Sequence, residues 1–272
     1  MDITGHNRER VSTGFGKTTC GYFLVKDTKI LYSSTHLQSR KCPFRPDYSK
    51  GYVWPLDDYD IFVANVDGTD LTRLTSTPGY DAEATLSPDG QTIVFTSLRD
   101  GDLNLYLMNI DGFNVRQITN TLGYEGGAFF SPDGSKIVYR AYIPKTPDEI
   151  VDYRNLLREK KIRPVSLQLF VMDQDGSNKR QITHLPGANF APFFHPDGTR
   201  IIFSSNHHNL KGKNFDLFII NMDGSGLEQI TFHPAFDGFP MFTRDGKKLA
   251  FASNRDAEKS GETNIFIVEW KD

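Results

Sequence analysis

The sequence predicts an all-β chain of repeated, four-stranded antiparallel units, and three observations support this fold class. A turn of the Ser-Pro-Asp-Gly kind recurs at residues 87–90, 131–134, 195–198 and 243–246. Short runs rich in β-branched and aromatic residues surround each turn, as is typical of strands. The turns return about every 44–48 residues, apart from one interval that an insertion lengthens, and this period is typical of propeller blades.

Each unit starts with two strands joined by that turn. The predicted first strands are residues 82–86, 126–130, 190–194 and 238–242, and the second strands contain residues 93–95, 137–139, 201–203 and 249–251. In the turn between them, Pro presets φ, Ser and Asp accept local hydrogen bonds, and Gly closes the chain reversal.

The second half of each unit is a hairpin. The predicted third strands are residues 104–109, 168–173, 216–221 and 264–269. After the first three of these, an Asp-Gly pair, which is a strong hairpin signal, leads to a polar fourth strand ending in Ile-Thr at residues 118–119, 182–183 and 230–231. An upstream copy, residues 21–34 and 60–75, lacks the Ser-Pro-Asp-Gly turn but keeps the other parts. The chain therefore contains five repeat units.

The apolar runs indicate how the units pack. They hold three consecutive apolar residues instead of a strict alternation, which indicates sheets covered on both faces. We therefore predict a β-propeller of four-stranded blades, in a single domain over residues 1–272. Residues 7–13 read as an isolated fourth strand, and residues 264–269 as a third strand without a fourth. We expect the N-terminal strand to close the last blade, because this would remove two exposed edges.

Two stretches interrupt the repeat. In the insertion at about 145–164, Thr146 is a candidate cap, Pro147 suits the first helical position, and apolar residues recur three or four apart. We predict one short helix at about 147–160, which either covers a patch of blade or acts as a lid or partner-binding element. The other stretch, residues 36–60, is rich in Pro, Arg and aromatic residues, and forms either an ordered surface loop or an aromatic rim for a ligand.

The repeated phrases carry a family resemblance. The Ser-Pro-Asp-Gly turn, the Ile-Val-Phe run, the Leu-Tyr-x-Met-Asn-x-Asp-Gly hairpin and the closing Ile-Thr resemble the TolB-type β-propeller repeat over essentially the whole chain. The resemblance implies a periplasmic or otherwise extracytoplasmic protein, and it is shared by scaffold proteins and by propellers attached to peptidases. Propellers of this type usually have six blades, so the sequence leaves open whether five blades close or most of one is missing.

Composition and motifs exclude several functions. The net charge of −3 gives no electrostatic case for nucleic acid binding, and no apolar stretch approaches the roughly 18–20 residues that span a bilayer. No nucleophile elbow, zinc-protease motif, P-loop or dinucleotide fingerprint appears. The two cysteines, Cys20 and Cys42, are compatible with one disulfide or with two thiols.

Aligning the repeats places candidate site residues in two columns. The first column, just before the first strands, contains Thr18, Asp81, Glu125, Asn189 and Asp237, with Glu83 nearby. The second column, just after the second strands, contains His36, Arg99, Ile143, His207 and Arg255, with His208 adjacent. Both columns fall on the side that carries the loops between strands 2 and 3 and between successive units. The turns within the two hairpins fall on the opposite side.

Two interpretations of these columns stay open. In one, charge-assisted hydrogen bonds lock neighbouring blades together. In the other, the residues ring the mouth of a central channel and bind a cation or the basic end of a partner, although no spacing selects a metal. We expect no other cofactor. The sequence favours a non-catalytic scaffold that binds a protein or peptide partner through this face; the alternative is a propeller module of a peptidase or other hydrolase, or a propeller enzyme with its site at the channel mouth.

Overall fold

The computed structural model describes residues 1, 4–24, 27–49, 51–210 and 214–271. Within these residues the chain forms five antiparallel sheets of the predicted kind, a small two-stranded sheet and one helix. The chain separates into two compact units. The first unit comprises Met1–Tyr124 and Pro144–Arg163, and the second comprises Glu125–Ile143 and Pro164–Asp272. The expectation of a single domain over the whole chain stays a prediction.

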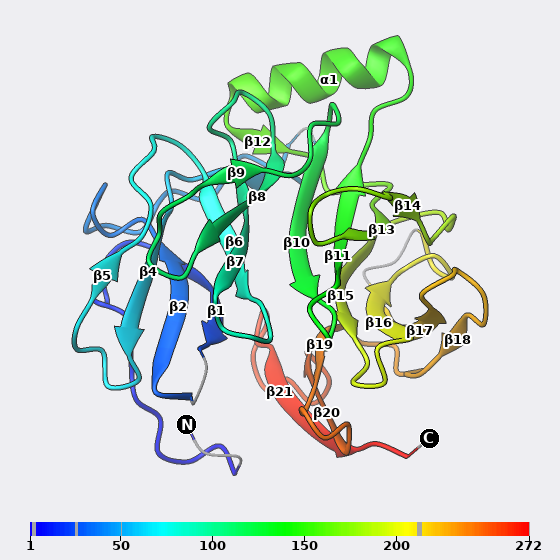
Figure 1. Cartoon of the computed structure of the whole chain (residues 1–272). Helices are drawn as coiled ribbons and strands as arrows, with labels where there is room; N and C mark the ends of the chain where they lie inside the picture. Colours follow the sequence, from blue (N-terminus) through cyan, green and yellow to red (C-terminus); the bar gives the residue numbers. More distant parts are fainter. Residues whose placement is uncertain (2–3, 25–26, 50, 211–213, 272) are drawn as a thin grey trace. The chain divides into compact units, whose positions relative to one another are not determined.

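The first unit holds two of the four-stranded sheets (Figure 1). In spatial order, the first is β1 (Thr18–Phe23), β2 (Lys29–Ser34), β4 (Asp60–Asn65) and β5 (Thr72–Arg73). The second is β6 (Asp81–Leu86), β7 (Thr92–Ser97), β8 (Asn104–Asn109) and β9 (Arg116–Gln117). Since each strand pairs with the strand that follows it within its own sheet, both sheets are simple meanders.

The second unit continues the same meander in three sheets. The first is β10 (Tyr124–Phe130), β11 (Lys136–Tyr142), β13 (Gln168–Asp173) and β14 (Arg180–Gln181). The next is β15 (Asn189–Phe194), β16 (Arg200–Ser205), β17 (Asp216–Asn221) and β18 (Glu228–Gln229). The last contains three strands, β19 (Asp237–Phe242), β20 (Lys248–Ser253) and β21 (Asn264–Glu269).

The apolar runs of the second and third strands form the core within each unit. In the first unit, Ile93 and Phe95 of β7 are fully buried and pack with Leu31 and Ile61 of the preceding sheet. In the second unit, Val138 of β11 packs in the same way with residues of β16 and β17. Burial on both faces explains why the runs are continuously apolar instead of alternating.

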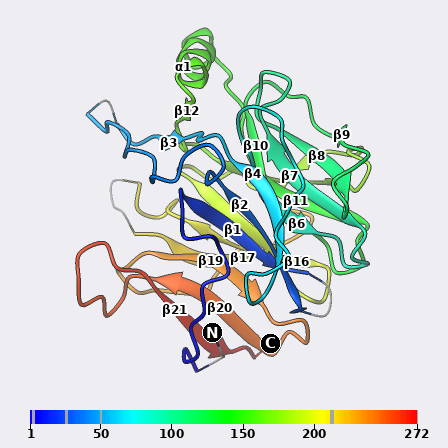
Figure 2. The ribbon, with the colours of Figure 1, turned by 90° about the vertical axis from the view of Figure 1, so that its left-hand side faces the viewer.

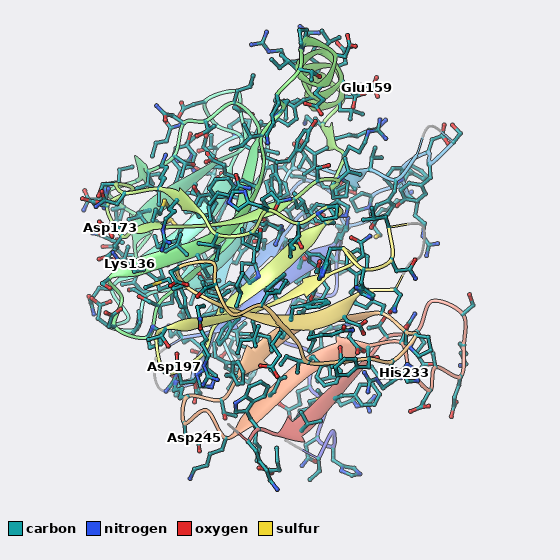
Figure 3. All side chains as sticks on the ribbon, turned by 90° about the vertical axis from the view of Figure 1, so that its right-hand side faces the viewer. Lys136, Glu159, Asp173, Asp197, His233 and Asp245 are labelled. Atoms are coloured by element: carbon teal, nitrogen blue, oxygen red, sulfur yellow. The ribbon has the colours of Figure 1, made fainter. Side chains whose placement is uncertain are left out.

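The Ser-Pro-Asp-Gly turns form as predicted. In the first of them, Gly90 has a φ of 76° and donates its N–H to the Ser87 carbonyl at 2.9 Å. The Ser87 hydroxyl donates to Asp89 and thereby lowers the pKa of that carboxyl. In the second unit, Figure 3 shows turn residues Asp197 and Asp245 at one edge and His233, which follows a fourth strand, at the opposite edge. The hairpin turns and the loops between sheets thus lie on opposite sides of this unit.

The predicted helix is present as α1 (Pro147–Arg158). Thr146 caps it in a capping box with Glu149, as the N-terminal sequence predicts. Tyr153 is the buried residue of its apolar face, and its hydroxyl donates to Asp102 in the loop before β8. After the helix, β12 (Lys161–Ile162) pairs with β3 (Trp54–Pro55), so the two insertions of the sequence meet in the first unit (Figure 2).

One prediction about the blades is wrong. We expected the N-terminal segment to supply a fourth strand to the last sheet, but that sheet has three strands among the described residues. Residues 8–12 form no strand. Instead, Val11 packs within the first unit on an apolar cluster of Tyr32, Phe62 and Ala64. This packing partly buries Val11, which is the one apolar side chain of residues 7–13.

Candidate functional site

The two predicted columns meet within single sheets. In the second sheet, Asp81 starts β6, is almost fully buried, and lies opposite Ser97 at the end of β7. The Ser97 hydroxyl donates to Asp81 at 2.5 Å, and the Arg99 guanidinium donates to both carboxylate oxygens at 3.2 Å. Arg99 also donates from its Nε to the Ser97 hydroxyl at 2.9 Å. The buried carboxylate is therefore neutralised inside its own sheet.

The last sheet repeats this arrangement in the second unit. Asp237 is fully buried and accepts from Arg255 Nη2 at 2.5 Å. The Nε of Arg255 donates to the Ser253 hydroxyl at 3.0 Å, and its guanidinium stacks on the rings of Phe251 and Phe266. These ion pairs join the first two strands of one sheet. They are not the bridges between neighbouring blades that one interpretation of the sequence expected.

Other sheets contain an uncharged version of the same arrangement. The Ser205 hydroxyl donates to Asn189 at 2.6 Å and is 3.0 Å from Nδ1 of His207. In the first sheet, Nδ1 of His36 is 2.9 Å from the hydroxyl of Ser34. Burial lowers the pKa of His207, and the neighbouring His208 lowers it further. Burial also lowers the pKa of His36. Both imidazoles are therefore uncharged near neutral pH.

The remaining predicted site residues lie apart from these pairs. Glu83 is half-buried and accepts hydrogen bonds from the hydroxyls of Thr96 and Tyr124. Glu125 is almost fully buried in β10. Nε2 of His208 lies 2.9 Å from the Asp216 carboxylate, and burial raises the pKa of that carboxyl. The ring of such residues around a channel mouth stays a prediction.

The serines are the residues that the sequence interpretation missed. Each ends a second strand, lies opposite the first residue of the first strand, and accepts the backbone N–H of the residue two positions later: Ser34, Ser97, Ser205 and Ser253. The signal was present, because the same serine recurs two residues before His36, Arg99, His207 and Arg255. Its repetition indicates a structural role in four of the five sheets.

No metal centre can be assigned. Across the described ranges, no three His, Cys, Asp or Glu side chains are grouped so that they could hold an ion. Cys20 and Cys42 are exposed thiols that are not joined in a disulfide. A bound cation therefore stays a prediction, with no ligand set to support it.

A cluster of phenylalanines in the second unit breaks the repeat. Phe190 lies in contact with three other rings, at centroid distances of 5.2 Å to Phe215, 6.4 Å to Phe236 and 5.5 Å to Phe239. Phe215 precedes β17 and Phe236 precedes β19, so both belong to the loop side of the sheets. Phe190 is 7% exposed, whereas Phe239 is 57% exposed. We call these four residues the phenylalanine cluster.

Phe239 has an unfavourable backbone conformation. It lies at a bulge in β19 and has a φ of 55°. Every first strand has a residue with positive φ at this place: Cys20, Glu83, Gly127, Ala191 and Phe239. Such a φ suits glycine and costs a bulky residue of order 1–3 kcal/mol. The exposed phenylalanine at this position therefore carries a conformational cost that opposes the contacts of its ring with Phe190 and Phe236.

Comparison with known proteins agrees with this architecture. Residues 43–146 and 161–272 match a family described as the TolB beta propeller domain. These stretches make up more than half of the chain and confirm the predicted repeat, and with it the all-β propeller fold class with one inserted helix. No curated protein matches the chain.

Several solved structures share the fold. A putative TolB from Agrobacterium tumefaciens has 19% identity and a TM-score of 0.65, covering 93% of this chain and 77% of its own. TolB from Acinetobacter baumannii has 17% identity and a TM-score of 0.61, with coverage of 89% and 63%. An oligogalacturonate lyase from Vibrio parahaemolyticus has 15% identity and a TM-score of 0.57, with coverage of 91% and 63%. The chain thus spans less than two thirds of the last two proteins, and identities this low show the fold alone.

Proposed function

The chain belongs to the family of TolB β-propeller domains, and we propose that it is a binding protein that holds a protein or peptide partner against its phenylalanine cluster. The observation that carries this proposal is the exposed Phe239 ring, held at positive φ over Phe190 and Phe236. Backbone strain at an exposed aromatic residue is typical of a site kept for binding. The partner site lies on the loop side of the second unit, as the sequence predicts for that unit.

The chemistry of the cluster indicates what the partner presents. Phe190 is buried and Phe215 and Phe236 are half-buried, so these three rings provide a rigid apolar floor, and the more exposed Phe239 lies on it. Aromatic side chains that are already ordered bind apolar groups with little loss of entropy and commonly form the centre of an interface. We therefore expect the partner to insert an aliphatic or aromatic side chain beside Phe239.

The predicted charged residues have a supporting role in this proposal. Asp81 and Asp237 already have arginine partners inside their sheets, so they provide stability and shape rather than free charge. His207 and His208 lie on the same side of the second unit, after β16, and could donate or accept hydrogen bonds at the rim. These residues do not combine into a set of nucleophile, base and orienting group. We therefore propose the binding role.

We propose a periplasmic or otherwise extracytoplasmic location on the basis of the family. No helix among the described residues is long and apolar enough to cross a membrane. Fractionation of the native cells, with detection of the chain in the periplasmic extract, tests this part of the proposal. Recovery of the chain with the cytoplasmic proteins alone would contradict it.

The binding role is tested by comparing what three forms of the chain capture. Wild type, Phe239→Gly and Phe113→Ser are immobilised and exposed to the native envelope fraction, and the bound proteins are quantified by mass spectrometry. Phe113 is 70% exposed in a hairpin turn of the first unit and serves as the control. We expect a partner that wild type and Phe113→Ser retain and that Phe239→Gly loses. Equal capture by all three forms would contradict the proposal.

A further inference from the structure

Each four-stranded sheet covers the edge of its third strand with the same short segment. The segment consists of an Arg or Gln, an apolar residue and a Thr, and it occurs as Arg73-Leu74-Thr75, Gln117-Ile118-Thr119, Gln181-Ile182-Thr183 and Gln229-Ile230-Thr231. Its first residue lies opposite an aromatic residue of the third strand, as Gln117 does to Tyr106. The structure therefore repeats one recognition pattern four times.

The contacts of this segment are the same in each sheet. In the second sheet, Ile118 donates its N–H to the Leu105 carbonyl at 2.9 Å, and the Leu105 N–H donates to the Thr119 hydroxyl at 2.8 Å. Equivalent pairs of bonds, all at 2.8–2.9 Å, reach Ile61, Leu169 and Leu217. The segment thus satisfies both backbone groups of a single residue on the third strand. In the fourth sheet the Gln229 amide also donates to Asp216, the first residue of that strand.

The last sheet has no such segment among the described residues. Its third strand, β21 (red in Figure 1), forms the edge of the sheet. Ile265 has the place that Leu105 has in the second sheet, since both pair with the fifth residue of their second strands. Ile265 is 61% exposed, whereas Leu105 is fully buried. Ile267 and Val268 are also exposed, although their counterparts Leu107 and Met108 are buried.

This edge has none of the usual protection against pairing. Native edge strands carry Lys, Pro or a bulge that discourages an additional strand, but β21 has the sequence Asn-Ile-Phe-Ile-Val-Glu and an unbroken register with β20. It is six residues long, like the third strands that are covered in the other sheets. The edge is therefore long and regular enough to pair with one more strand.

We propose that β21 accepts an extended segment of a partner protein, which pairs antiparallel with it and carries the pattern Arg or Gln, apolar residue, Thr. This mode of binding is β-strand addition, in which backbone hydrogen bonds provide affinity and side chains provide selectivity. The Thr hydroxyl accepts the N–H of Ile265, and the apolar residue donates its N–H to the Ile265 carbonyl. Glu262, which is half-buried, and Glu269, which is exposed, border the strand, and their charge favours a basic segment such as the Arg-containing strands of the other sheets.

The chain's own residues 10–12, Arg-Val-Ser, have a similar pattern but are engaged elsewhere. The Val11 side chain packs on the cluster of Tyr32, Phe62 and Ala64 in the first unit. The Val11 carbonyl lies so close to Gly68 that a Cβ there would approach it to 2.8 Å. This packing leaves the β21 edge for a partner. The edge is a different surface from the phenylalanine cluster, so each proposal can be tested independently of the other.

A labelled peptide tests the edge directly. The probe copies residues 114–120, Asn-Val-Arg-Gln-Ile-Thr-Asn, and its binding to the full chain is measured by fluorescence anisotropy. We expect saturable binding that weakens about tenfold when the peptide Thr is replaced by Val, because one hydrogen bond is lost. The Ile267→Pro variant removes an N–H that points to the same side as that of Ile265, so it should bind no peptide. Ile267→Thr keeps that N–H and should bind as wild type does.

Four outcomes would overturn the proposal. The first is a peptide that binds no better than a scrambled version, and the second is an Ile267→Pro variant that binds the peptide as wild type does and melts at the same temperature. A wild-type dimer that Ile267→Pro converts to a monomer would show that a second copy fills the edge. A Ser12→Pro variant that binds the peptide about tenfold more tightly would show that the chain's own N-terminal segment competes for it.

Discussion

At the scale of single residues, the buried polar side chains form local sets that satisfy one another. Asp81, Ser97 and Arg99 illustrate the arrangement, since the serine donates to the carboxylate and accepts from the arginine. A buried carboxylate without such partners would be strongly destabilising. The repeated serine therefore contributes to the stability of the four sheets that contain it, independently of any ligand.

We predict that Ser97→Ala destabilises the chain by about 1–3 kcal/mol, because a buried acceptor loses a donor. Arg99 continues to compensate the charge of Asp81, so the chain should still fold. Urea unfolding measures the change, and the exposed Ser260→Ala serves as a control with an effect below about 0.5 kcal/mol. A value for Ser97→Ala as small as that of the control would show that the serine is dispensable.

The histidines make stability depend on pH. Burial lowers the pKa of His207 and of His36 in the folded chain, whereas in the unfolded chain both titrate near about 6.5. Their contribution is present above that value and is lost as the pH falls through the folded pKa, since the unfolded state then binds more protons. We predict that the melting temperature falls between pH 7.5 and pH 5 and falls less in His207→Gln. An identical pH profile for the variant would contradict this assignment.

At the scale of elements, the α1 insertion is attached to the first unit by few contacts. Tyr153 donates to Asp102, Lys160 forms an ion pair with Asp58 at 2.6 Å, and β12 pairs with β3 over two residues. Asp102 also accepts the N–H groups of Leu103 and Gly123, so it keeps partners if the tyrosine hydroxyl is removed.

We predict that Tyr153→Phe loosens the insertion without unfolding the sheets. Trypsin should then cleave within residues 154–161 several times faster than in wild type, while the melting temperature of the chain changes little. Val151→Ala, at an exposed position of the same helix, is the matched control and should be cleaved at the wild-type rate. Unchanged cleavage of Tyr153→Phe would show that the hydroxyl does not hold the helix in place.

The elements also show what sequence can and cannot predict. The hairpins and α1 were predictable because each depends on local chemistry: Gly90 at positive φ in a turn, or Thr146 and Glu149 in a capping box. The bulge in each first strand was not predictable, because its residues share no chemistry. Glu83 and Phe239 both have a φ near that of Gly127. Of the three residue types, only glycine indicates a positive φ from the sequence.

At the scale of the whole chain, the repeat accounts for the match to the family, and both binding proposals are based on the parts that depart from the repeat. Five sheets with one strand order follow from the repeated turns, and the family match confirms them. The columns of candidate residues could be aligned from the sequence. Their pairing within a sheet could not be predicted, because it depends on the serine that lies opposite each acidic residue. The missing fourth strand of the last sheet and the phenylalanine cluster are departures from the repeat, and both carry binding proposals.

The central claim is that Phe239 is kept for binding and not for stability, and the free energy of unfolding of Phe239→Gly tests it most directly. Glycine relieves the positive φ, which offsets the loss of contacts with Phe190 and Phe236. We predict a free energy of unfolding within about 1 kcal/mol of wild type in a urea titration. A loss of about 3–5 kcal/mol, the usual cost of removing a buried phenylalanine, would contradict the account.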